Sequence, residues 1–577
     1  MKKIILLTLL ISNITFSQSF QWGKRGGGNN NISTDLRAEQ ALKIVTDPNN
    51  NVYTISRVTS TGLDVDGNTR PYYDSQLESD YVLSSFACDG TYRWSKTIGG
   101  KGFEGIYLAT DGLGNVYVGG KFGACQDNNY PPQIEGDIII PQTPQDCSLI
   151  FLVKFDTNGV MQWFKRPQNT NVAPSVGLSQ TGTLGLEVDN FGNSYWLVGV
   201  PPGTYADGAF TSTETTTKFF IFKYDTNGNF VSATLMDFMV SGSFGQNLRF
   251  YRNPQTGQYY LTSNKANSGS ASAILGTSTI AGSFFIASFD ANGQKLWHQE
   301  DTAGASGLSF QSYDLVTDSS NNVYFTGKMD GSNVATFMGV SSPTLYAKSY
   351  IIKLNPTGST VLWGTVSEGI GVYENAGLAI KNNEIGLANA CFGPNYTWGT
   401  QSIFVSNVNE GTEVLLARFN TATGDCIGLV KIPGNIGFED SGTALAVDSA
   451  GDYIIGGRFG QELYINGTTT LTNQGAQSDF FIVKYATSPC STASTDGFEK
   501  DQVLHFYPNP VNDMLTIEVK EASNYTLYNI QGRIIQQGKL TSSENTIDCN
   551  VLDAGVYMLE VVDTTTNNKQ VVKVVKN

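Results

Sequence analysis

Apolar and polar residues alternate along most of the chain in short segments that turn-forming residues separate. One recurring segment is an Asp or Asn, a turn rich in Gly and Asn, and a strand centred on Tyr, as in "TDGLGNVYVGG" from Thr110. Pairs such as Asn-Gly adopt positive φ at low cost, so this segment predicts a β-hairpin. Seven copies occur, 64 to 78 residues apart, and their first turn residues (the anchors) are Asp47, Asp111, Asp189, Asn253, Asp318, Asn382 and Asp448.

A second repeated element falls between successive copies of the first. It is an apolar strand, a turn such as Asp-x-Asn-Gly and a strand that ends in Trp, as in "FLVKFDTNGVMQW" ending at Trp163. The recurring Trp predicts packing between sheets, with a carbohydrate platform as the alternative. Each repeat therefore contains two hairpins. Seven four-stranded units predict a β-propeller, because radial packing lets each sheet bury both faces against its neighbours.

The seventh repeat lacks its last strand. Its third strand lies in "DFFIVKYATSPC" from Asp479, and no Trp strand follows, whereas "SFQWGKRGGG" from Ser19 is a Trp strand without a sheet. We expect Phe20 to Lys24 to add to the edge of the seventh sheet. This addition would close the ring and cover two exposed strand edges.

The repeats resemble those of seven-bladed propellers of secreted bacterial proteins. The shared patterns are "D-x-x-G-N-x-Y-x-x-G" and "D-x-F-x-x-K-x-D-x-x-G-x-x-x-W", and the resemblance extends from about Phe20 to Tyr485. It implies the fold and says almost nothing about activity.

The composition changes after the seventh repeat. Residues 488–502 are small and polar, which predicts a linker. Residues 503–577 alternate apolar residues with Asn-Pro, Gln-Gly and Ala-Gly turns, which predicts a small Ig-like β-sandwich.

This tail resembles the type A C-terminal sorting domain of the type IX secretion system. The residues that carry the resemblance are Tyr507, Pro508, Asn509, Pro510, Gly532, Gly555, Tyr557, Lys573 and Lys576. The resemblance implies the type IX machinery as a partner, and a mature protein that is secreted or attached to the outer surface. The alternative is an ordinary Ig-like adhesion or binding module.

The N-terminus has the layout of a secretory signal peptide. Residues 1–18, "MKKIILLTLLISNITFSQ", hold two lysines, a short apolar run and small residues near Ser17. The run is too short to span a hydrocarbon core of ~30 Å, so we expect no transmembrane segment in the mature chain. The predicted organisation is a signal peptide (1–18), a propeller (19–487), a linker (488–502) and a sorting domain (503–577).

Composition and charge narrow the possible functions. The chain has 62 Gly, 27 Tyr and 32 Phe, as expected of a turn-rich β protein, and a formal net charge of -15, which excludes nucleic acid as a partner. Seven Cys in an exported chain permit disulfides, with one Cys left over. The candidate pairs are Cys125 with Cys147 and Cys391 with Cys426; the alternative is that most are buried small apolar residues.

Residues for catalysis are scarce. The two His, His298 and His505, offer little material for a Ser-His-Asp triad or a zinc site, and there is no phosphate-binding loop. Turn chemistry accounts for the Asp-x-Asn-Gly segments, although they resemble the start of a calcium loop. We therefore predict no metal and no cofactor.

Polar and acidic residues recur seven to nine positions before the anchors, where the first strand of each repeat begins. In a propeller they would surround one mouth of the central channel, where they could bind a cation, a sugar or a peptide amine. The alternative is that they bridge adjacent sheets through backbone hydrogen bonds. The candidates are Glu39, Glu104, Gln246, Gln311, Glu374, Glu439 and Asp440.

Three functions are compatible with this interpretation, the third being a purely structural role in a surface layer. The first is a secreted or cell-surface binding or adhesion scaffold, with a glycan or protein as the possible ligand. The alternative is an extracellular carbohydrate-active enzyme, a glycoside hydrolase or lyase, in which two carboxylates at the channel mouth act on a sugar. Its first candidates are Glu104, Glu374 and Glu439.

Overall fold

The structure is a computed structural model of the 577-residue chain. Contacts divide the chain into two units, residues 1–491 and 492–577, and each is described separately. The structure describes residues 18–29, 39–73, 79–100, 103–122, 130–140, 149–167, 182–242, 244, 248–265, 271–301, 308–331, 336–341, 347–370, 375–405, 411–475, 477–487, 490, 505–519, 521–529, 533–541, 544–564 and 569–577.

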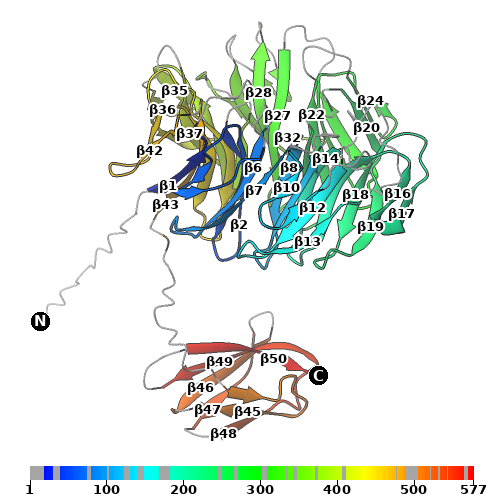
Figure 1. Ribbon diagram of the computed structural model, residues 1–577, viewed down its shortest axis with the longest axis vertical. Helices are drawn as coiled ribbons and strands as arrows, with labels where there is room; N and C mark the ends of the chain where they lie inside the picture. The colour runs from blue at the N-terminus through cyan, green and yellow to red at the C-terminus, as the bar shows by residue number, and fades with distance from the viewer. Residues whose placement is uncertain are drawn as a thin grey trace, which may run out of the picture. The chain divides into compact units, whose positions relative to one another are not determined.

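The first unit is built around seven antiparallel sheets (Figure 1). Each has four main strands, which follow the order of the chain in all but the last sheet. Sheet 1 contains β2 (Gln40–Thr46), β3 (Val52–Val58), β6 (Asp80–Phe86) and β7 (Tyr92–Gly99). Sheet 2 contains β8 (Phe103–Thr110), β9 (Val116–Phe122), β12 (Leu149–Phe155) and β13 (Met161–Lys165). Sheet 3 contains β14 (Gly182–Val188), β15 (Ser194–Val200), β18 (Lys218–Tyr224) and β19 (Phe230–Leu235). Sheet 4 contains β21 (Arg249–Arg252), β22 (Tyr259–Asn264), β25 (Phe284–Phe289) and β26 (Lys295–Glu300).

The remaining three sheets follow the same plan. Sheet 5 contains β27 (Leu308–Thr317), β28 (Val323–Gly331), β31 (Lys348–Leu354) and β32 (Val361–Val366). Sheet 6 contains β33 (Gly377–Lys381), β34 (Glu384–Cys391), β37 (Glu413–Asn420) and β38 (Cys426–Ile432). Sheet 7 contains β39 (Ser441–Val447), β40 (Tyr453–Phe459), β43 (Asp479–Ala486) and β1 (Ser19–Gly27).

Short strands extend or flank these sheets. They are β4 (Asp64–Val65), β5 (Asn68–Thr69), β10 (Gln133–Ile134), β11 (Ile138–Ile139), β16 (Gly203–Tyr205), β17 (Phe210–Ser212), β20 (Phe238–Ser241), β23 (Ser272–Leu275), β24 (Ser278–Thr279), β29 (Thr336–Phe337), β30 (Val340–Ser341), β35 (Asn395–Trp398), β36 (Gln401–Phe404), β41 (Glu462–Tyr464) and β42 (Thr470–Thr472). Helix is nearly absent from the described residues, where η1 (Ala206–Gly208) is a short 3₁₀ turn. The all-β class predicted from the sequence is confirmed.

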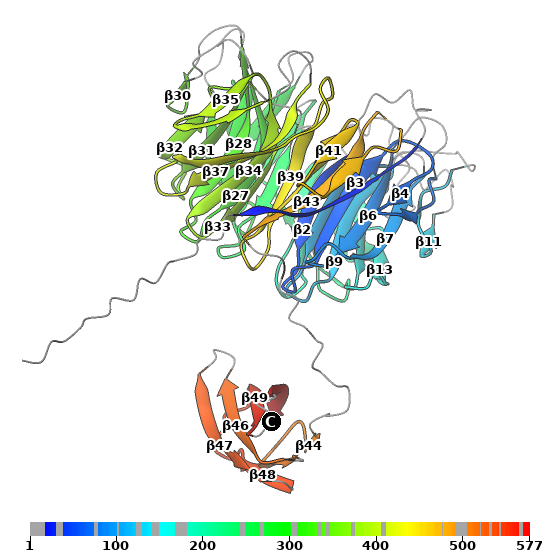
Figure 2. The same cartoon turned by 90° about the vertical axis from the view of Figure 1, so that its left-hand side faces the viewer.

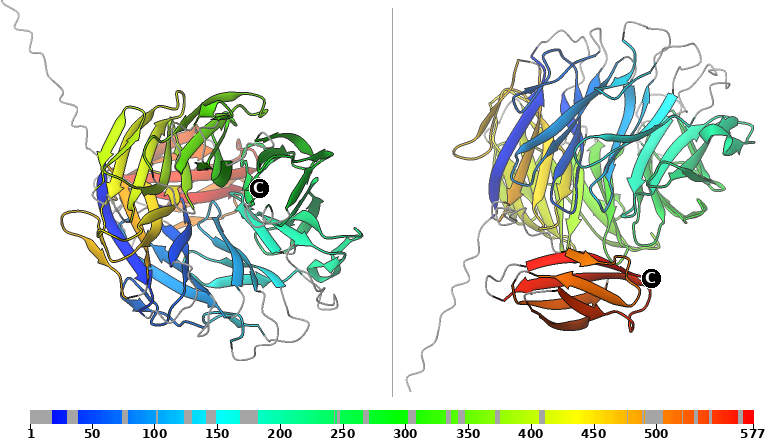
Figure 3. Two further views of the ribbon diagram at one scale, coloured as in Figure 1. Left: turned by 90° about the horizontal axis from the view of Figure 1, so that it is seen from above. Right: turned by 60° about the horizontal axis from the view of Figure 1, so that its bottom comes forward.

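The first strands of the seven sheets surround a common centre (Figure 3, left). Each contacts the first strand of the next sheet, from β2 through β8, β14, β21, β27 and β33 to β39, and β39 contacts β2. Figure 2 labels β2 and β39, from opposite ends of the repeat array, close together. Clusters of buried apolar residues fill the space between neighbouring sheets; one of them, for example, joins Tyr53 and Leu83 of sheet 1 to Val118 of sheet 2. Each sheet therefore buries both of its faces.

The N-terminal strand occupies the edge that the seventh repeat leaves open. β1 pairs antiparallel with β43, from Ser19 opposite Ala486 to Gly26 opposite Phe480 (Figure 1). Both ends of the unit thus contribute to sheet 7, and the backbone groups of β43 are paired on both sides.

The anchor residues explain why the first hairpin of each repeat forms. In sheet 2, Asp111 Oδ1 accepts hydrogen bonds from the Leu113 and Asn115 amides, while Oδ2 accepts from Asn115 Nδ2 (2.7 Å) and from Tyr117 OH (3.1 Å). The same pattern recurs at Asp47, Asp189 and Asp318. The repeated Asp, Asn and Tyr therefore serve turn formation.

The recurring tryptophans join five of the seven sheets to the next. Trp94 Nε1 in sheet 1 donates to the Thr157 carbonyl in the second turn of sheet 2 at 2.9 Å. Its ring packs on Gly159, where a Cβ would lie 2.6 Å from the indole, so this turn requires glycine for space as well as for its φ of 78°. Equivalent bonds are made by Trp22, Trp163, Trp297 and Trp363. This contact is the packing role that the sequence predicts.

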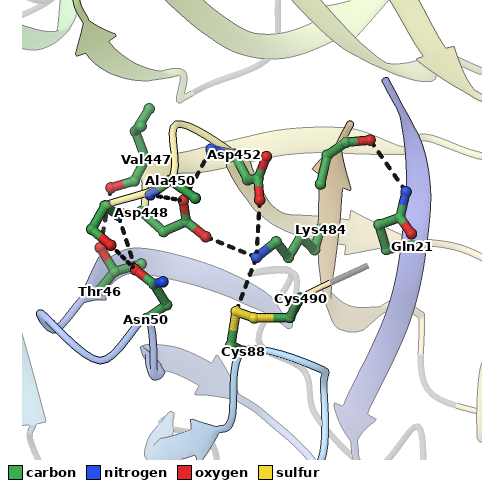
Figure 4. Close-up of polar contacts among 12 residues, drawn as sticks. Gln21, Thr46, Asn50, Cys88, Val447, Asp448, Ala450, Asp452, Lys484 and Cys490 are labelled. Atoms are coloured by element: carbon green, nitrogen blue, oxygen red, sulfur yellow. Dashed lines mark hydrogen bonds and ion pairs between the residues drawn. A yellow bond between two sulfur atoms is a disulfide. The ribbon is translucent and has the colours of Figure 1, made fainter. Parts of the chain in front are cut away.

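The cysteine pairing differs from the predicted one. Cys88, in the second turn of sheet 1, forms a disulfide with Cys490, and the two residues are 402 positions apart (Figure 4). Cys391 and Cys426 are buried and free, so the predicted bond between them is wrong. That prediction chose pairs close in sequence, whereas closure of the ring brings the end of the seventh repeat to the first. Cys125 and Cys147 lie outside the described residues.

The second unit contains two antiparallel sheets around one apolar core. One sheet has β44 (His505–Tyr507), β45 (Met514–Glu518) and β48 (Glu544–Asp548); the other has β47 (Ile534–Leu540), β46 (Ser523–Asn529), β49 (Gly555–Asp563) and β50 (Lys569–Lys576). Leu515 and Ile547 of the first sheet and Leu527 and Leu559 of the second are buried in that core.

Candidate functional site

A cavity of 590 Å³ lies among the first strands of the seven sheets. Every one of these strands contributes lining residues, so the cavity is at the centre of the ring. Its volume falls in the range of small-molecule sites, about 300 to 1,000 Å³.

Four charged side chains of the first strands line the cavity. Lys43 comes from β2, Glu187 from β14, Arg249 from β21 and Asp314 from β27. Two cations and two anions thus face one cavity from four different sheets. The formal charge of the four is balanced.

Two of the four also tie neighbouring first strands together. Arg249 Nε donates to the Tyr313 carbonyl of sheet 5 at 3.1 Å, and Asp314 Oδ2 accepts from the Leu378 amide of sheet 6 at 2.9 Å. Lys43 and Glu187, in contrast, form no hydrogen bond or ion pair with the described residues. They are therefore the two charges with capacity left for a ligand.

Burial makes the Glu187 carboxyl group easier to protonate than that of an ordinary glutamate. Burial among the first strands and the charge of Asp314 raise the pKa of Glu187 to about 7, although Lys43 and Arg252 oppose this shift. A carboxyl group with a pKa near neutrality can both accept and donate a proton under physiological conditions. Burial also raises the pKa of Tyr107, so this cavity residue stays a neutral hydroxyl.

The described members of the predicted channel-mouth set lie outside this cavity. Glu39, Gln311, Glu439 and Asp440 do not line the cavity. Gln246, Glu374 and the side chain of Glu104 lie outside the described residues.

Glu39 bridges adjacent sheets through backbone hydrogen bonds, which is the alternative to ligand binding that the sequence offers for these residues. Its carboxylate accepts hydrogen bonds from the Gly28 amide beyond β1, and from the Thr59 amide and Ser60 Oγ beyond β3. It therefore connects sheets 7 and 1, and it is 1% exposed. Burial raises the pKa of Glu39, while these donors lower it.

The other described members of the set also have protein partners. Gln311 Oε1 accepts from Tyr313 OH at 2.7 Å, Glu439 pairs with Arg458 at 3.2 Å, and Asp440 Oδ1 accepts from the Gly460 amide at 2.9 Å. Burial raises the pKa of Asp440 to about 7. Ligand binding by these residues stays a prediction.

Sequence reasoning missed the four cavity charges, although a signal was present. Lys43, Arg249 and Asp314 each stand four residues before the anchor of their repeat, where other copies have Tyr107, Gly185, Leu378 and Ala444. Glu187 stands two before its anchor, where other copies have Val45, Ala109, Val316, Ile380 and Ala446. At these positions of the first strand, the four residues are charged where most other repeats have an uncharged residue. This difference between repeats would have identified them.

Metal binding finds no support in the described part of the chain, where no group of three His, Cys, Asp or Glu side chains is arranged to hold an ion. His298 lies on β26, 3.4 Å from Lys295 Nζ, and burial lowers its pKa.

Among the described residues there is no helix long and apolar enough to cross a membrane.

In the second unit, most predicted sorting residues cluster where the start of the unit meets its last strand. Asn509 Nδ2 donates to the Lys573 carbonyl at 2.9 Å, and Asn509 Oδ1 accepts from the Val575 amide at 2.8 Å. Gly555 pairs with Lys576 across β49 and β50. Tyr557 OH donates to the Asp553 carbonyl, and Pro508 and Pro510 follow cis peptide bonds after Tyr507 and Asn509. Gly532 lies outside the described residues.

Comparison with known proteins supports the interpretation of this tail. Residues 505–577 match the family model of the secretion system C-terminal sorting domain. The chain therefore carries a type IX sorting domain at its C-terminus, as predicted, and the domain indicates export across the outer membrane to the cell surface or the medium.

The other comparisons carry no argument about the fold or the function. A search of curated proteins gives no match. A protein of unknown function from Dyadobacter fermentans is similar at 10% identity over 79% of this chain and 97% of its own, with a TM-score of 0.34. PorZ, a surface component of the type IX secretion system of Porphyromonas gingivalis, is similar at 11% identity over 94% and 100%, with a TM-score of 0.18. At these scores neither likeness defines the fold or the function of this chain.

Proposed function

We propose that this chain is a secreted or outer-surface binding protein, exported by the type IX system, whose binding body is a seven-bladed β-propeller. Seven four-stranded sheets whose first strands contact one another in a closed order support the propeller. The match of residues 505–577 to the sorting domain supports the export route. The propeller then serves as a rigid scaffold.

The observation that carries the binding function is the central cavity. It combines a volume of 590 Å³ with charged side chains from four sheets, and the first strands that hold them are fixed on both sides by their neighbours. Ligand sites are typically concave and largely preformed, with a few polar groups that fix orientation. The chemistry of the cavity walls, rather than the outer surface, is therefore expected to select the ligand.

A variant that fills the cavity tests this proposal. The full mature chain is screened by thermal shift against sugars, amino acids and short peptides, since a ligand that binds only the folded state raises Tm. Ala109→Trp adds an indole at the cavity wall, where sheets 2 and 3 meet, and Val231→Trp adds the same group on the exposed outer strand β19 as the control.

We expect ligands that stabilise the wild type and Val231→Trp but not Ala109→Trp. Ala446→Trp, from the opposite side of the cavity wall, repeats the test if Ala109→Trp unfolds. Stabilisation that survives both cavity variants, or a panel without any stabilising member, would contradict a binding site in the cavity.

A carbohydrate-active enzyme is the second candidate, and the pKa of Glu187 favours it. Glycoside cleavage uses a general acid and a second carboxylate. Glu187, with a pKa of about 7, matches the general acid, and Asp314 in the same cavity matches the carboxylate. Release of reducing ends from polysaccharides that is lost in Glu187→Gln would establish this activity. Retention of a glycan without release supports the binding protein instead.

A further inference from the structure

Lys43 and Glu187 are opposite charges that face the central cavity without a partner of their own. Lys43 lies in the middle of β2 and Glu187 near the end of β14, two sheets away around the ring. Both line the cavity, and the positive charge of Lys43 lowers the pKa of the Glu187 carboxyl group, against the larger effect of burial. Neither forms a hydrogen bond or ion pair with any part of the chain that the structure describes.

The surrounding groups make an unpaired charge unfavourable at Glu187, which is partly buried, whereas Lys43 is exposed. The cavity walls contain Val45, Ile106, Leu108, Ala109 and Leu186, and a charge near apolar walls is poorly solvated compared with one in bulk water. A ligand that supplied both an anion and a cation would satisfy both residues at once. A ligand with one charge would satisfy one of them and leave the other unpaired.

The two remaining charged residues of the cavity, Arg249 and Asp314, also carry opposite charges. Arg249 and Asp314 are held by backbone groups of the next sheet, so they contribute a fixed positive and a fixed negative field from the other side of the ring. Above pH 7, where Glu187 is mostly ionised, the four residues carry two charges of each sign, and the cavity has no net preference for anions or cations. Tyr107 and Tyr251 add hydroxyl groups and ring faces to the same walls.

We propose that the cavity binds a small zwitterion with a free carboxylate and a free ammonium group, such as an amino acid or a short peptide. The ligand carboxylate pairs with Lys43 Nζ and the ligand ammonium with the Glu187 carboxylate. This inference rests on the proposed binding function and names its ligand class. Neutral sugars and singly charged ligands bind more weakly, because they leave Lys43, Glu187 or both unpaired.

The experiment is isothermal titration calorimetry of the full mature chain at about pH 7.5, where most of Glu187 is ionised. The probes are the twenty standard L-amino acids and Ala-Ala, each titrated singly, followed by the N-acetyl and methyl ester forms of the best binder and by maltose as a neutral ligand. We expect at least one zwitterion to bind, and each blocked form to bind about tenfold or more weakly, the effect of losing one charge-assisted contact.

Two variants test which protein residue binds the carboxylate of the ligand and which binds its ammonium group. Lys43→Met should remove the preference for the free carboxylate and keep the preference for the free amine. Glu187→Gln should do the reverse, a crossed pattern that general destabilisation cannot produce. Lys165→Met on β13 and Glu214→Gln make the same chemical changes away from the cavity and should leave all affinities unchanged.

The outcomes separate this inference from the proposed function. Equal affinity for the free, acetylated and esterified forms, or binding of maltose alone, overturns the zwitterion inference; loss of that binding in Ala109→Trp would still support a cavity site. Absence of heat from every amino acid and from Ala-Ala also overturns the inference, and the wider panel then decides whether the cavity binds anything.

Discussion

Trp22 Nε1 donates a hydrogen bond to the carbonyl oxygen of Cys88 at 2.9 Å. The Cys88 side chain is in turn bonded to Cys490 (Figure 4). The N-terminal strand, the first repeat and the end of the last repeat therefore meet at one place. Lys484 joins the same contact region, 3.2 Å from Cys88 Sγ and 2.8 Å from Asp448. These contacts hold sheet 7 against sheet 1, and the residues that make them are Trp22, Cys88, Asp448, Lys484 and Cys490.

Loss of the disulfide should destabilise the first unit. Cys88→Ser or Cys490→Ser removes a bond that closes most of the chain, and such a bond stabilises by about 2 to 5 kcal/mol, chiefly by restricting the unfolded state. Chemical denaturation of the full chain measures the change. Reductant should lower the stability of the wild type and leave the double variant Cys88→Ser/Cys490→Ser unaffected. Equal sensitivity of both would refute the role of this bond.

Trp22 should be the tryptophan whose loss opens the ring. Trp22 is 9% exposed, packs on Gly90 and donates to Cys88, so Trp22→Ala should cost about 3 to 5 kcal/mol. Trp22→Phe keeps most of the packing and should cost about 1 kcal/mol for the lost hydrogen bond. The comparison is Trp297→Phe, which loses the equivalent bond between sheets 4 and 5. Limited proteolysis near residue 19 should accelerate in Trp22→Ala only.

Removal of Lys484 should be costly because it leaves buried carboxylates without a cation. The Lys484 and Asp448 side chains are each 1% exposed, and Lys484 also lies 3.2 Å from Asp452. Lys484→Met should destabilise the chain by about 3 to 5 kcal/mol, the typical effect of breaking a buried pair from one side. The double variant Lys484→Met/Asp448→Asn should recover part of this loss in the free energy of unfolding. No recovery would show that Lys484 acts through packing alone.

Stability should fall as the pH rises through neutrality because of Asp479. Burial and the neighbouring Glu39 and Asp64 raise the pKa of Asp479 to about 8, while Arg25 and the Gln474 amide oppose the shift. The folded state then holds a proton that the unfolded chain releases near pH 4, so stability decreases between about pH 4 and pH 8, by up to about 1.4 kcal/mol per pH unit.

The variant Asp479→Asn removes this titration. Its free energy of unfolding should change less than that of the wild type between pH 5 and pH 8, and the gain relative to the wild type should be largest at pH 8. Asp425→Asn, which changes an exposed turn, provides the matched control. A wild-type stability that rises with pH over this range would contradict the assignment.

The sorting domain should be required for the last step of export. A chain that ends before residue 505 should accumulate in the periplasm, whereas the full chain reaches the surface or the medium. Asn509→Ala removes the side chain that holds the start of this unit to β50, so it should reduce export partially. Surface labelling and fractionation of the producing cells measure both effects, and normal export of the truncated chain would refute the role of the tail.

Local patterns determined much of the architecture. The alternation of apolar and polar residues, the Asp and Asn turns and the seven anchors were enough to predict an all-β chain of repeated hairpins. The unpaired Trp strand at Ser19 was also enough to place β1 at the edge of β43. These features could be read from the sequence because hairpins and strand faces depend on residues a few positions apart.

Tertiary structure decided the features that depend on closure of the ring. It paired Cys88 with Cys490 rather than residues close in sequence, and it buried Glu39 under backbone donors from two sheets. It also brought Lys43, Glu187, Arg249 and Asp314 into one cavity from four separate repeats. Sequence spacing specifies which face of a strand a residue occupies, but the distance between residues hundreds of positions apart is set only when the sheets pack around their common centre.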